Sequence, residues 1–358
     1  MSKFISKRFD RLEEYVPGEQ PQDKKYIKLN TNESPYPPSP MVTKAINEDE
    51  VNDLRLYSDP EAKELKKRIA EYYNTCAENV FVSNGSDETL NFFFMAFCDE
   101  EKKVAFPDIS YGFYEVFAQL YNLDYKKIPL LQDFSIDVHD YENIGRNVVI
   151  ANPNAPTGLA LGLNDIEKIV ASNREYIVVI DEAYVDFGAQ SAVGLTEKYD
   201  NLLVVQTFSK SRSLAGARLG FAIGNGELIK DLEKIKFSTN PYNVNRLTII
   251  AGEQAVADRE YFEKTRASII SNRRLLSDGL KNLGFAVTDS KANFVFAESD
   301  KISGEEYYQN LKERGILVRH FSDKKICNYN RITVGTAEEV NELLAATEKI
   351  LDEKGRNV

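Results

Sequence analysis

The stretch TFSKSRSLAGARLGFAIG, residues 207–224, places a lysine directly after an apolar run and an arginine eight residues further on. The residues before that lysine, NLLVVQTFS at 201–209, have the apolar, β-branched composition of a buried strand. A buried lysine without a partner is unfavourable, whereas the carboxyl end of a strand in an α/β sheet is where ligands commonly bind. We therefore interpret Lys210 and Arg218 as two cations held near one ligand. The alternative is two ordinary surface charges.

Strand-like and helix-like segments alternate along the chain on the N-terminal side of this stretch. Apolar strand patterns lie at 79–83, 103–107, 124–130, 147–152, 176–184 and 201–209. Helical patterns precede or separate them at 61–74, 86–98, 111–121 and 164–175. This alternation predicts an α/β domain with a mostly parallel sheet, and ligands of such domains bind at the carboxyl ends of the strands.

The pattern divides the chain into an arm and two domains. Residues 1–40 form an N-terminal arm that ends in LNTNESPYPPSP, where four prolines enforce an extended path. Residues 41–245 form the larger domain. A long polar helical stretch, 246–282, opens a smaller α/β domain that covers 246–358, and we expect the arm to pack with that domain.

Composition excludes several classes of protein. The 358 residues are 42% hydrophobic and carry a net charge of −11, which is typical of a globular protein and argues against nucleic-acid binding. Three cysteines in unrelated contexts and two histidines predict neither a disulfide framework nor a metal site. The sequence contains no apolar run of about 18 residues and no signal peptide, so we expect no membrane association and a cytoplasmic location.

Two further motifs lie at predicted strand ends. NGSDETL, 84–90, puts Gly85, Ser86 and Asp87 at the start of a helix, where free N–H groups and the helix dipole favour a phosphate. The alternative is a plain capped helix. Asp181 ends an apolar strand, so its carboxylate needs a cationic partner or several hydrogen bonds. The alternative there is a structural ion pair.

Together these features form one chemical set. An aldehyde cofactor needs an amine with which to form a Schiff base, and pyridoxal 5′-phosphate also needs an acid at its pyridine nitrogen and anchors for its phosphate. At this point the sequence resembles the fold-type I aminotransferases over essentially its whole length, and within them the histidinol-phosphate aminotransferase group. The resemblance is carried by LNTNESPYPPSP, NGSDE, NPNAPTG, DEAY, TFSKSRSLAGARLGF and RITVGT.

The resemblance implies a fold, a cofactor and roles for three catalytic residues. The fold is the three-layer architecture of the pyridoxal-phosphate-dependent transferases, with a mostly parallel sheet and a smaller C-terminal α/β domain. Lys210 would bond to pyridoxal 5′-phosphate and then carry the proton between the reacting atoms. Asp181 would pair with the pyridine nitrogen, and Tyr184 would donate to the phenolic oxygen.

The resemblance also implies a set of cofactor contacts. Tyr111 matches the aromatic residue that stacks on the ring, and Tyr57 matches a tyrosine that reaches the phosphate bound by the neighbouring subunit, so a homodimer is expected. The residues expected at the phosphate are Gly85, Ser86, Asp87, Thr207, Ser209 and Arg218.

One position departs from the family pattern. The family motif NPNNPTG carries an asparagine that also hydrogen-bonds the phenolic oxygen, and this chain has Ala155 there. Asn154, one residue earlier, is our expected substitute, with Asn152 as a further candidate. Loss of one such bond would cost about 0.5–1.5 kcal/mol, or about 1.5–3 kcal/mol if the bond is charge-assisted, which would alter the reactivity of the bound cofactor without abolishing the chemistry.

Two arginines suggest the substrate. Arg331 in NRITVGT fits the arginine that this family uses for the acidic end of the substrate, and Arg319 in GILVRHF fits a second arginine aimed at a substrate phosphate. Two guanidinium groups suit a phosphate dianion. The resemblance thus implies transamination of L-histidinol phosphate with 2-oxoglutarate, giving imidazole-acetol phosphate and L-glutamate in histidine biosynthesis.

Three alternatives stay open at this point. An aromatic amino-acid aminotransferase is consistent with the 19 tyrosines and 20 phenylalanines. A threonine-phosphate decarboxylase also binds a phosphorylated amine, but it would need a further cation or donor for the carboxylate that it removes. A cofactor-binding regulator without turnover usually carries an added DNA-binding module, for which the residues before NTNESPYPPSP are too few.

Overall fold

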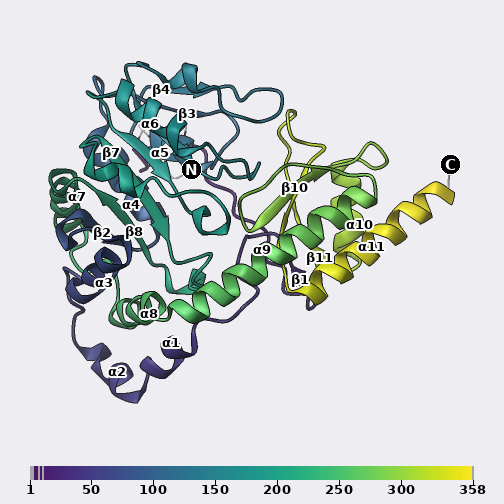
Figure 1. Ribbon diagram of the computed structural model, residues 1–358, viewed down its shortest axis with the longest axis horizontal. Helices are drawn as coiled ribbons and strands as arrows, with labels where there is room; N and C mark the ends of the chain where they lie inside the picture. The colour runs from purple at the N-terminus through teal and green to yellow at the C-terminus, as the bar shows by residue number, and fades with distance from the viewer. Residues whose placement is uncertain (1–3, 7–8, 10–11, 357–358) are drawn as a thin grey trace.

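The computed structural model describes residues 4–6, 9 and 12–356, and a seven-stranded sheet lies at its centre (Figure 1). The neighbouring strands are paired in the order β2-β8-β7-β6-β5-β3-β4. β8 runs antiparallel to both of its neighbours, β2 and β7, and the other four strand pairs are parallel. The predicted α/β class with a mostly parallel sheet is thereby confirmed. In that order the strands span Val80–Ser83, Gly220–Gly224, Leu202–Thr207, Val178–Asp181, Asn147–Ala151, Val104–Pro107 and Tyr125–Ile128.

Helices cover both faces of this sheet and make three layers. Along β5 and β6 the side chains alternate, so that Val148 and Ile150 join one apolar cluster while Val149 and Ala151 join the other. The first cluster includes α3 (Lys63–Tyr73), α6 (Leu163–Ser172) and α8 (Arg246–Ala257). The second includes α4 (Ser86–Phe97), α5 (Phe113–Leu120) and α7 (Gly226–Thr239).

A smaller antiparallel sheet of order β12-β13-β10-β9 forms a second core. Figure 1 shows α9 running from α8 to this sheet, where α11 lies beside it. The later part of the predicted arm joins this part of the molecule, because β1 pairs in parallel with β11. The bounds are β1 Ile27–Lys28, α9 Arg259–Asn282, β9 Ala286–Val287, β10 Phe294–Glu298, α10 Gly304–Glu313, β11 Ile316–Leu317, β12 Arg319–His320, β13 Asn330–Thr333 and α11 Ala337–Arg356.

The expected single helical stretch 246–282 is two helices. Asp258 leaves helical geometry between α8 and α9, and its carboxylate accepts a hydrogen bond from the Tyr261 N–H, which caps α9. Helix α8 packs against α3 and against α1 (Pro40–Ala45), which α2 (Glu48–Asn52) follows. The domain limits at 40 and 245 stay predictions, and part of the predicted arm (1–3, 7–8 and 10–11) lies outside the described residues. Within the described part of the chain, no helix is long and apolar enough to span a membrane.

A buried carboxylate lies next to the end of β6. Glu182 is 2% exposed and accepts hydrogen bonds from Ser191 Oγ at 2.6 Å, from the Ala192 N–H at 2.6 Å and from Gln206 Nε2 at 2.8 Å. No cation is among these partners, and burial therefore raises the pKa of Glu182 to about 7 despite the hydrogen bonds.

This carboxylate predicts a pH dependence of stability. Because the folded pKa lies above the ordinary value of 4.5, the folded chain holds this proton more tightly than the unfolded chain. The tighter proton binding of Glu182 adds to the free energy of unfolding. This addition is complete below about pH 4.5, is lost by about pH 7 and amounts to a difference on the order of 3 kcal/mol. In Glu182→Gln we expect the free energy of unfolding of the apoprotein, measured in urea at about pH 5 and about pH 8, to fall less over this interval. An equal fall in both proteins would contradict the assignment, since all other titrating groups are shared.

Candidate active site

The carboxyl edge of the large sheet opens into a cavity of about 570 Å³. Its wall is built from the turns after the central strands, the start of α4, the segment 15–33 and the strands β12 and β13. Residues far apart in the sequence thus meet where the parallel strands end, as expected for this class of fold. Of the predicted residues, the cavity wall includes Ser86, Asp87, Tyr111, Asp181, Tyr184, Thr207, Ser209, Lys210, Arg218, Arg319 and Arg331.

Lys210 follows the end of β7 and is half-buried. Its Nζ donates to the Thr31 carbonyl at 3.4 Å and lies 5.7 Å from the ring centroid of Tyr184. No carboxylate forms an ion pair with this amine among the residues that the structure describes. The amine is therefore held at the cavity by a carbonyl rather than by a close ion pair, which leaves it available to react.

Asp181 ends β6 on the face that packs against α5. The carboxylate is 4% exposed and accepts hydrogen bonds from Tyr114 Oη at 2.8 Å and from the Ala183 N–H at 3.2 Å. Burial raises the pKa of Asp181 to about 6, and the hydrogen bonds partly oppose that shift. Since no described cation pairs with it, the alternative of a structural ion pair does not hold, and the carboxylate is suited to a positively charged ligand atom.

The start of α4 forms an anion cradle against β8. Gly85 caps the helix at a φ of +76°, and a Cβ placed there would lie 2.6 Å from Arg218 Nη2. A Cβ on Gly220 would lie 2.4 Å from the Ser86 nitrogen. The Gly85 N–H donates to the Ser83 carbonyl, so the predicted role of Gly85 as a direct contact becomes a conformational one. The amides of Ser86 and Asp87 are the free donors of this helix start.

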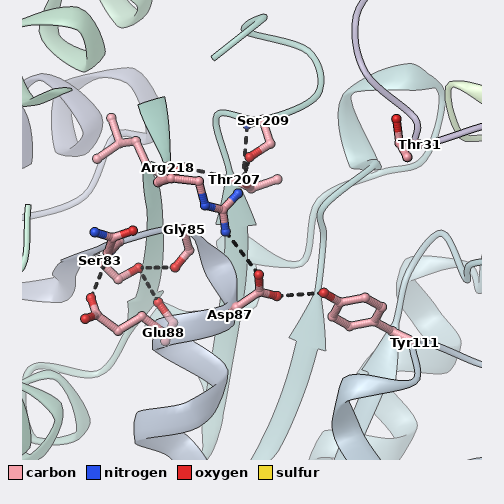
Figure 2. A network of polar contacts seen from close by, with 12 residues as sticks. Thr31, Ser83, Gly85, Asp87, Glu88, Tyr111, Thr207, Ser209 and Arg218 are labelled. Atoms are coloured by element: carbon pink, nitrogen blue, oxygen red, sulfur yellow. Dashed lines mark hydrogen bonds and ion pairs between the residues drawn. The ribbon is translucent and has the colours of Figure 1, made fainter. Parts of the chain in front are cut away.

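A second set of contacts connects this cradle to the aromatic wall. Figure 2 shows Asp87 between Arg218 and Tyr111. Asp87 Oδ2 lies 3.1 Å from Arg218 Nη2, and Tyr111 Oη donates to Asp87 Oδ1 at 2.8 Å. Burial raises the pKa of Tyr111, so its hydroxyl stays protonated. The protonated hydroxyl can keep its hydrogen bond to Asp87, which holds the aromatic ring at the cavity wall. We predicted a role only for the backbone of Asp87, and its side chain provides this additional link.

Arg319 and Arg331 lie directly opposite each other on the antiparallel strands β12 and β13. Arg331 Nη2 donates to the Asn30 carbonyl at 2.9 Å, while its buried Nε has no partner among the described residues. Arg319 donates two weak hydrogen bonds of 3.4 Å to carbonyls of the arm. Like charges directly opposite each other are unfavourable, and neither arginine forms an ion pair with a described carboxylate. Both line the cavity, so an anion placed there would balance them.

Asn154 does not take over the cofactor contact that we expected of it. Its Oδ1 accepts from Ser110 Oγ at 2.7 Å, and its Nδ2 donates to the Ile109 carbonyl and to Thr157. The Asn152 side chain is likewise occupied, by both backbone polar groups of Leu161. These asparagines fix the loop that carries the next residue of the motif. The cavity wall at that point is the side chain of Ala155, which has no donor.

Two further tyrosines, Tyr57 and Tyr15, differ in their position relative to the cavity. Tyr57 is 80% exposed, stacks on Tyr242 with ring centroids 4.4 Å apart, and does not line the cavity of its own chain. Tyr15, which we did not single out, lies in the cavity wall and stacks on Phe113 at 4.3 Å. The sequence carries no local signal for Tyr15, because its position depends on how the arm crosses the molecule.

Comparison with known proteins supports this arrangement. Residues 24–346 match the family model of class I and II aminotransferases. The chain is 55% identical to the histidinol-phosphate aminotransferase of Brachyspira hyodysenteriae over 95% of this chain and 97% of that protein. It is 52% identical to that of Clostridium acetobutylicum over 96% and 98%. A solved histidinol-phosphate aminotransferase from Sinorhizobium meliloti in complex with pyridoxal-5′-phosphate has the same fold, with a TM-score of 0.85 and 23% identity over 92% of each chain.

The anion cradle gives a test of its own. In Gly220→Ala the added carbon would lie 2.4 Å from the Ser86 nitrogen and 2.5 Å from the Gly85 carbonyl carbon, so the backbone at the start of α4 would have to shift. We expect the free energy of unfolding to drop by about 1–3 kcal/mol and the apoprotein to lose its thermal stabilisation by inorganic phosphate. Gly194→Ala is the matched control, because its added carbon meets no atom within 4 Å. Equal behaviour of the two variants would show that the close contact of β8 with α4 is not what shapes the cradle.

Proposed function

This chain belongs to the class I and II aminotransferase family, and we propose that it transfers the amino group of L-histidinol phosphate to 2-oxoglutarate. The products are imidazole-acetol phosphate and L-glutamate, and the reaction belongs to histidine biosynthesis. The names of the relatives and the chemistry of the cavity support the same substrate class. The cytoplasmic location stays a prediction.

The residues of the cavity fit pyridoxal 5′-phosphate. This cofactor requires an amine, a buried carboxylate, a helix start that is open to its phosphate and an arginine, and the cavity offers all four. Lys210 would hold the cofactor, and Asp181 would face its ring nitrogen. The Ser86 and Asp87 amides, the hydroxyls of Thr207 and Ser209 and the Arg218 guanidinium would hold its phosphate. When bound, the cofactor supplies an aldehyde that accepts the amino group and a ring that takes up electrons from the substrate carbon.

Each side chain has a task that follows from its surroundings. Lys210 would take the proton from the substrate carbon and give it back on the cofactor side of the amino nitrogen, because its amine lies at the cavity without a described ion-paired carboxylate that would keep it protonated. Asp181 stays charged once a positive ring nitrogen lies beside it, since that charge offsets the burial that raises its pKa. Tyr184 would donate a hydrogen bond to the phenolic oxygen of the cofactor and so stabilise its negative charge. Tyr111, which lines the cavity, would form one wall for the ring.

The observation that carries the substrate assignment is the pair of opposed arginines. Two guanidinium groups on neighbouring strands, one of them buried with an unpartnered Nε, provide planar donor sets for a phosphate dianion. The single carboxylate of an aromatic amino acid would need only one of these two cations. The side-chain carboxylate of 2-oxoglutarate carries the same sign of charge as the phosphate, so one site serves both halves of the reaction.

We further propose that the active form is a homodimer. Tyr57 lies in an exposed apolar region, and such regions mark interaction surfaces in folded proteins. A second copy of the chain would cover this region and bring Tyr57 to the phosphate held by its partner. The exposed members of the region are Val51, Leu54, Leu56, Tyr57 and Tyr242.

Removal of one arginine tests the substrate. In Arg319→Ala we expect kcat/KM for L-histidinol phosphate to fall by about 10–100-fold, because hydrogen bonds to a charged group are lost, and kcat/KM for L-phenylalanine to change far less. Arg314→Ala is the matched control, since that arginine pairs with Glu353 and does not line the cavity. Equal losses for both substrates would remove the basis for a phosphorylated amine.

Hybrid dimers test the shared site. Lys210→Ala should lack activity and the visible absorbance of the bound cofactor, and Tyr57→Ala should bind the cofactor weakly. In a hybrid of the two, one site combines Lys210 of one subunit with Tyr57 of the other, so activity at limiting cofactor should return in part. Differently tagged subunits can be co-expressed, purified over both tags and assayed. A hybrid no more active than its parents would contradict the role of Tyr57.

A further inference from the structure

Three consecutive residues of the N-terminal segment each contact a different functional side chain. The Asn30 carbonyl accepts from Arg331, the Thr31 carbonyl accepts from Lys210, and Asn32 Nδ2 donates to Tyr184 Oη at 3.0 Å. The first two contacts use the backbone, which any residue type supplies. The third uses a side chain that is 1% exposed, so it depends on the asparagine itself.

The amide of Asn32 has a defined orientation. Thr333 Oγ1 accepts a hydrogen bond from the Asn32 backbone N–H at 3.0 Å. The Thr333 hydroxyl in turn donates its own proton to Asn32 Oδ1, also at 3.0 Å. With the oxygen of the amide directed to Thr333, the nitrogen is directed to Tyr184. Asn293 Nδ2 donates to the Asn32 carbonyl at 3.0 Å and fixes the backbone. That backbone has a left-handed φ of 56°, which asparagine tolerates better than most residues.

This orientation determines where the proton of Tyr184 points. An amide nitrogen donates and does not accept, so the Tyr184 oxygen accepts from Asn32 and its proton must point elsewhere. No described residue accepts that proton, and Tyr184 lies in the cavity wall. We propose that Asn32, oriented by Thr333, is a positioning residue that directs the hydroxyl proton of Tyr184 into the cavity, toward the phenolic oxygen of the cofactor.

The contact of Asn32 with Tyr184 matters more in this chain because Ala155 replaces an asparagine of the family motif. Ala155 offers a methyl group where the family motif has an asparagine, and Asn152 and Asn154 are occupied elsewhere. Tyr184 is then the donor on which the phenolic oxygen depends. A hydroxyl that accepts a hydrogen bond is polarised into a better donor, so Asn32 also strengthens the remaining bond. The inference rests on the proposed function, because it concerns the cofactor of that reaction.

The test follows the pH midpoint of the visible absorbance change of the loaded enzyme, which reports the proton on the Lys210 nitrogen. A donor at the phenolic oxygen stabilises its negative charge and so favours loss of the Lys210 proton. Tyr184→Phe should therefore raise the midpoint. Asn32→Asp keeps the left-handed backbone and replaces the donor by an acceptor that turns the Tyr184 proton away, so it should raise the midpoint by about 0.5–1 pH unit. The uncharged Asn32→Ala should shift it in the same direction.

A double-variant cycle separates this effect from the added charge of the aspartate. If Asn32 acts through Tyr184, Asn32→Asp should add no shift in a Tyr184→Phe background, whereas a purely Coulombic effect would persist. Thr333→Val should raise the midpoint and Thr333→Ser should leave it unchanged, since serine keeps the hydroxyl. The other titratable groups that face Tyr184 stay the same in every variant. They are Tyr15, Tyr111, Tyr114, Lys210 and Arg331.

Asn330→Asp is the matched control. Asn330 is equally buried on β13, donates to the Gly304 carbonyl at 2.9 Å and does not line the cavity. It should lose thermal stability and keep the midpoint. The inference is overturned if Tyr184→Phe moves the midpoint while Asn32→Asp does not, or if the Asn32→Asp shift persists without the Tyr184 hydroxyl. Absence of any cofactor absorbance in the parent enzyme would overturn the proposed function and this inference together.

Discussion

Charges without counterions at one edge of the sheet are the constraint on which the site depends. Asp181 is buried without an ion pair to any described cation, while Arg319 and Arg331 lie opposite each other without an ion pair to any described carboxylate. Neither situation is favourable in a folded chain unless a ligand completes it. A ligand with a positive ring nitrogen near Asp181 and an acidic group near the arginines resolves both. The apolar core supplies the rigidity that holds these charges in place.

The three layers explain why the charges converge. Side chains alternate along β6, so Val179 and Asp181 point to the face that packs against α5, where Tyr114 meets the carboxylate. Parallel strands end at the same edge, which brings Lys210 to the same cavity as Asp181. The smaller sheet adds its two arginines from the other side. The N-terminal segment then crosses between the two sheets and contacts both.

Much of this was predictable from local sequence patterns, and some of it was not. Alternating apolar segments predict the α/β class, and strand-end positions indicate Lys210 and Asp181. The orientation of Asn154 is invisible in sequence, because it depends on Ser110 and Ile109 more than 40 residues away. The contact of Asn32 with Tyr184 spans 152 positions. Contacts of that range depend on the completed tertiary structure.

The most direct test of this account is a single half-reaction. The enzyme is loaded with pyridoxal 5′-phosphate and mixed, without a keto acid, with L-histidinol phosphate, L-phenylalanine or O-phosphothreonine in separate stopped-flow runs. We expect rapid conversion of the cofactor to its amino form with L-histidinol phosphate, slow conversion with L-phenylalanine and no CO2 from O-phosphothreonine. Faster conversion with L-phenylalanine would make this an aromatic amino-acid aminotransferase, and release of CO2 would make it a decarboxylase. Either result would contradict the account.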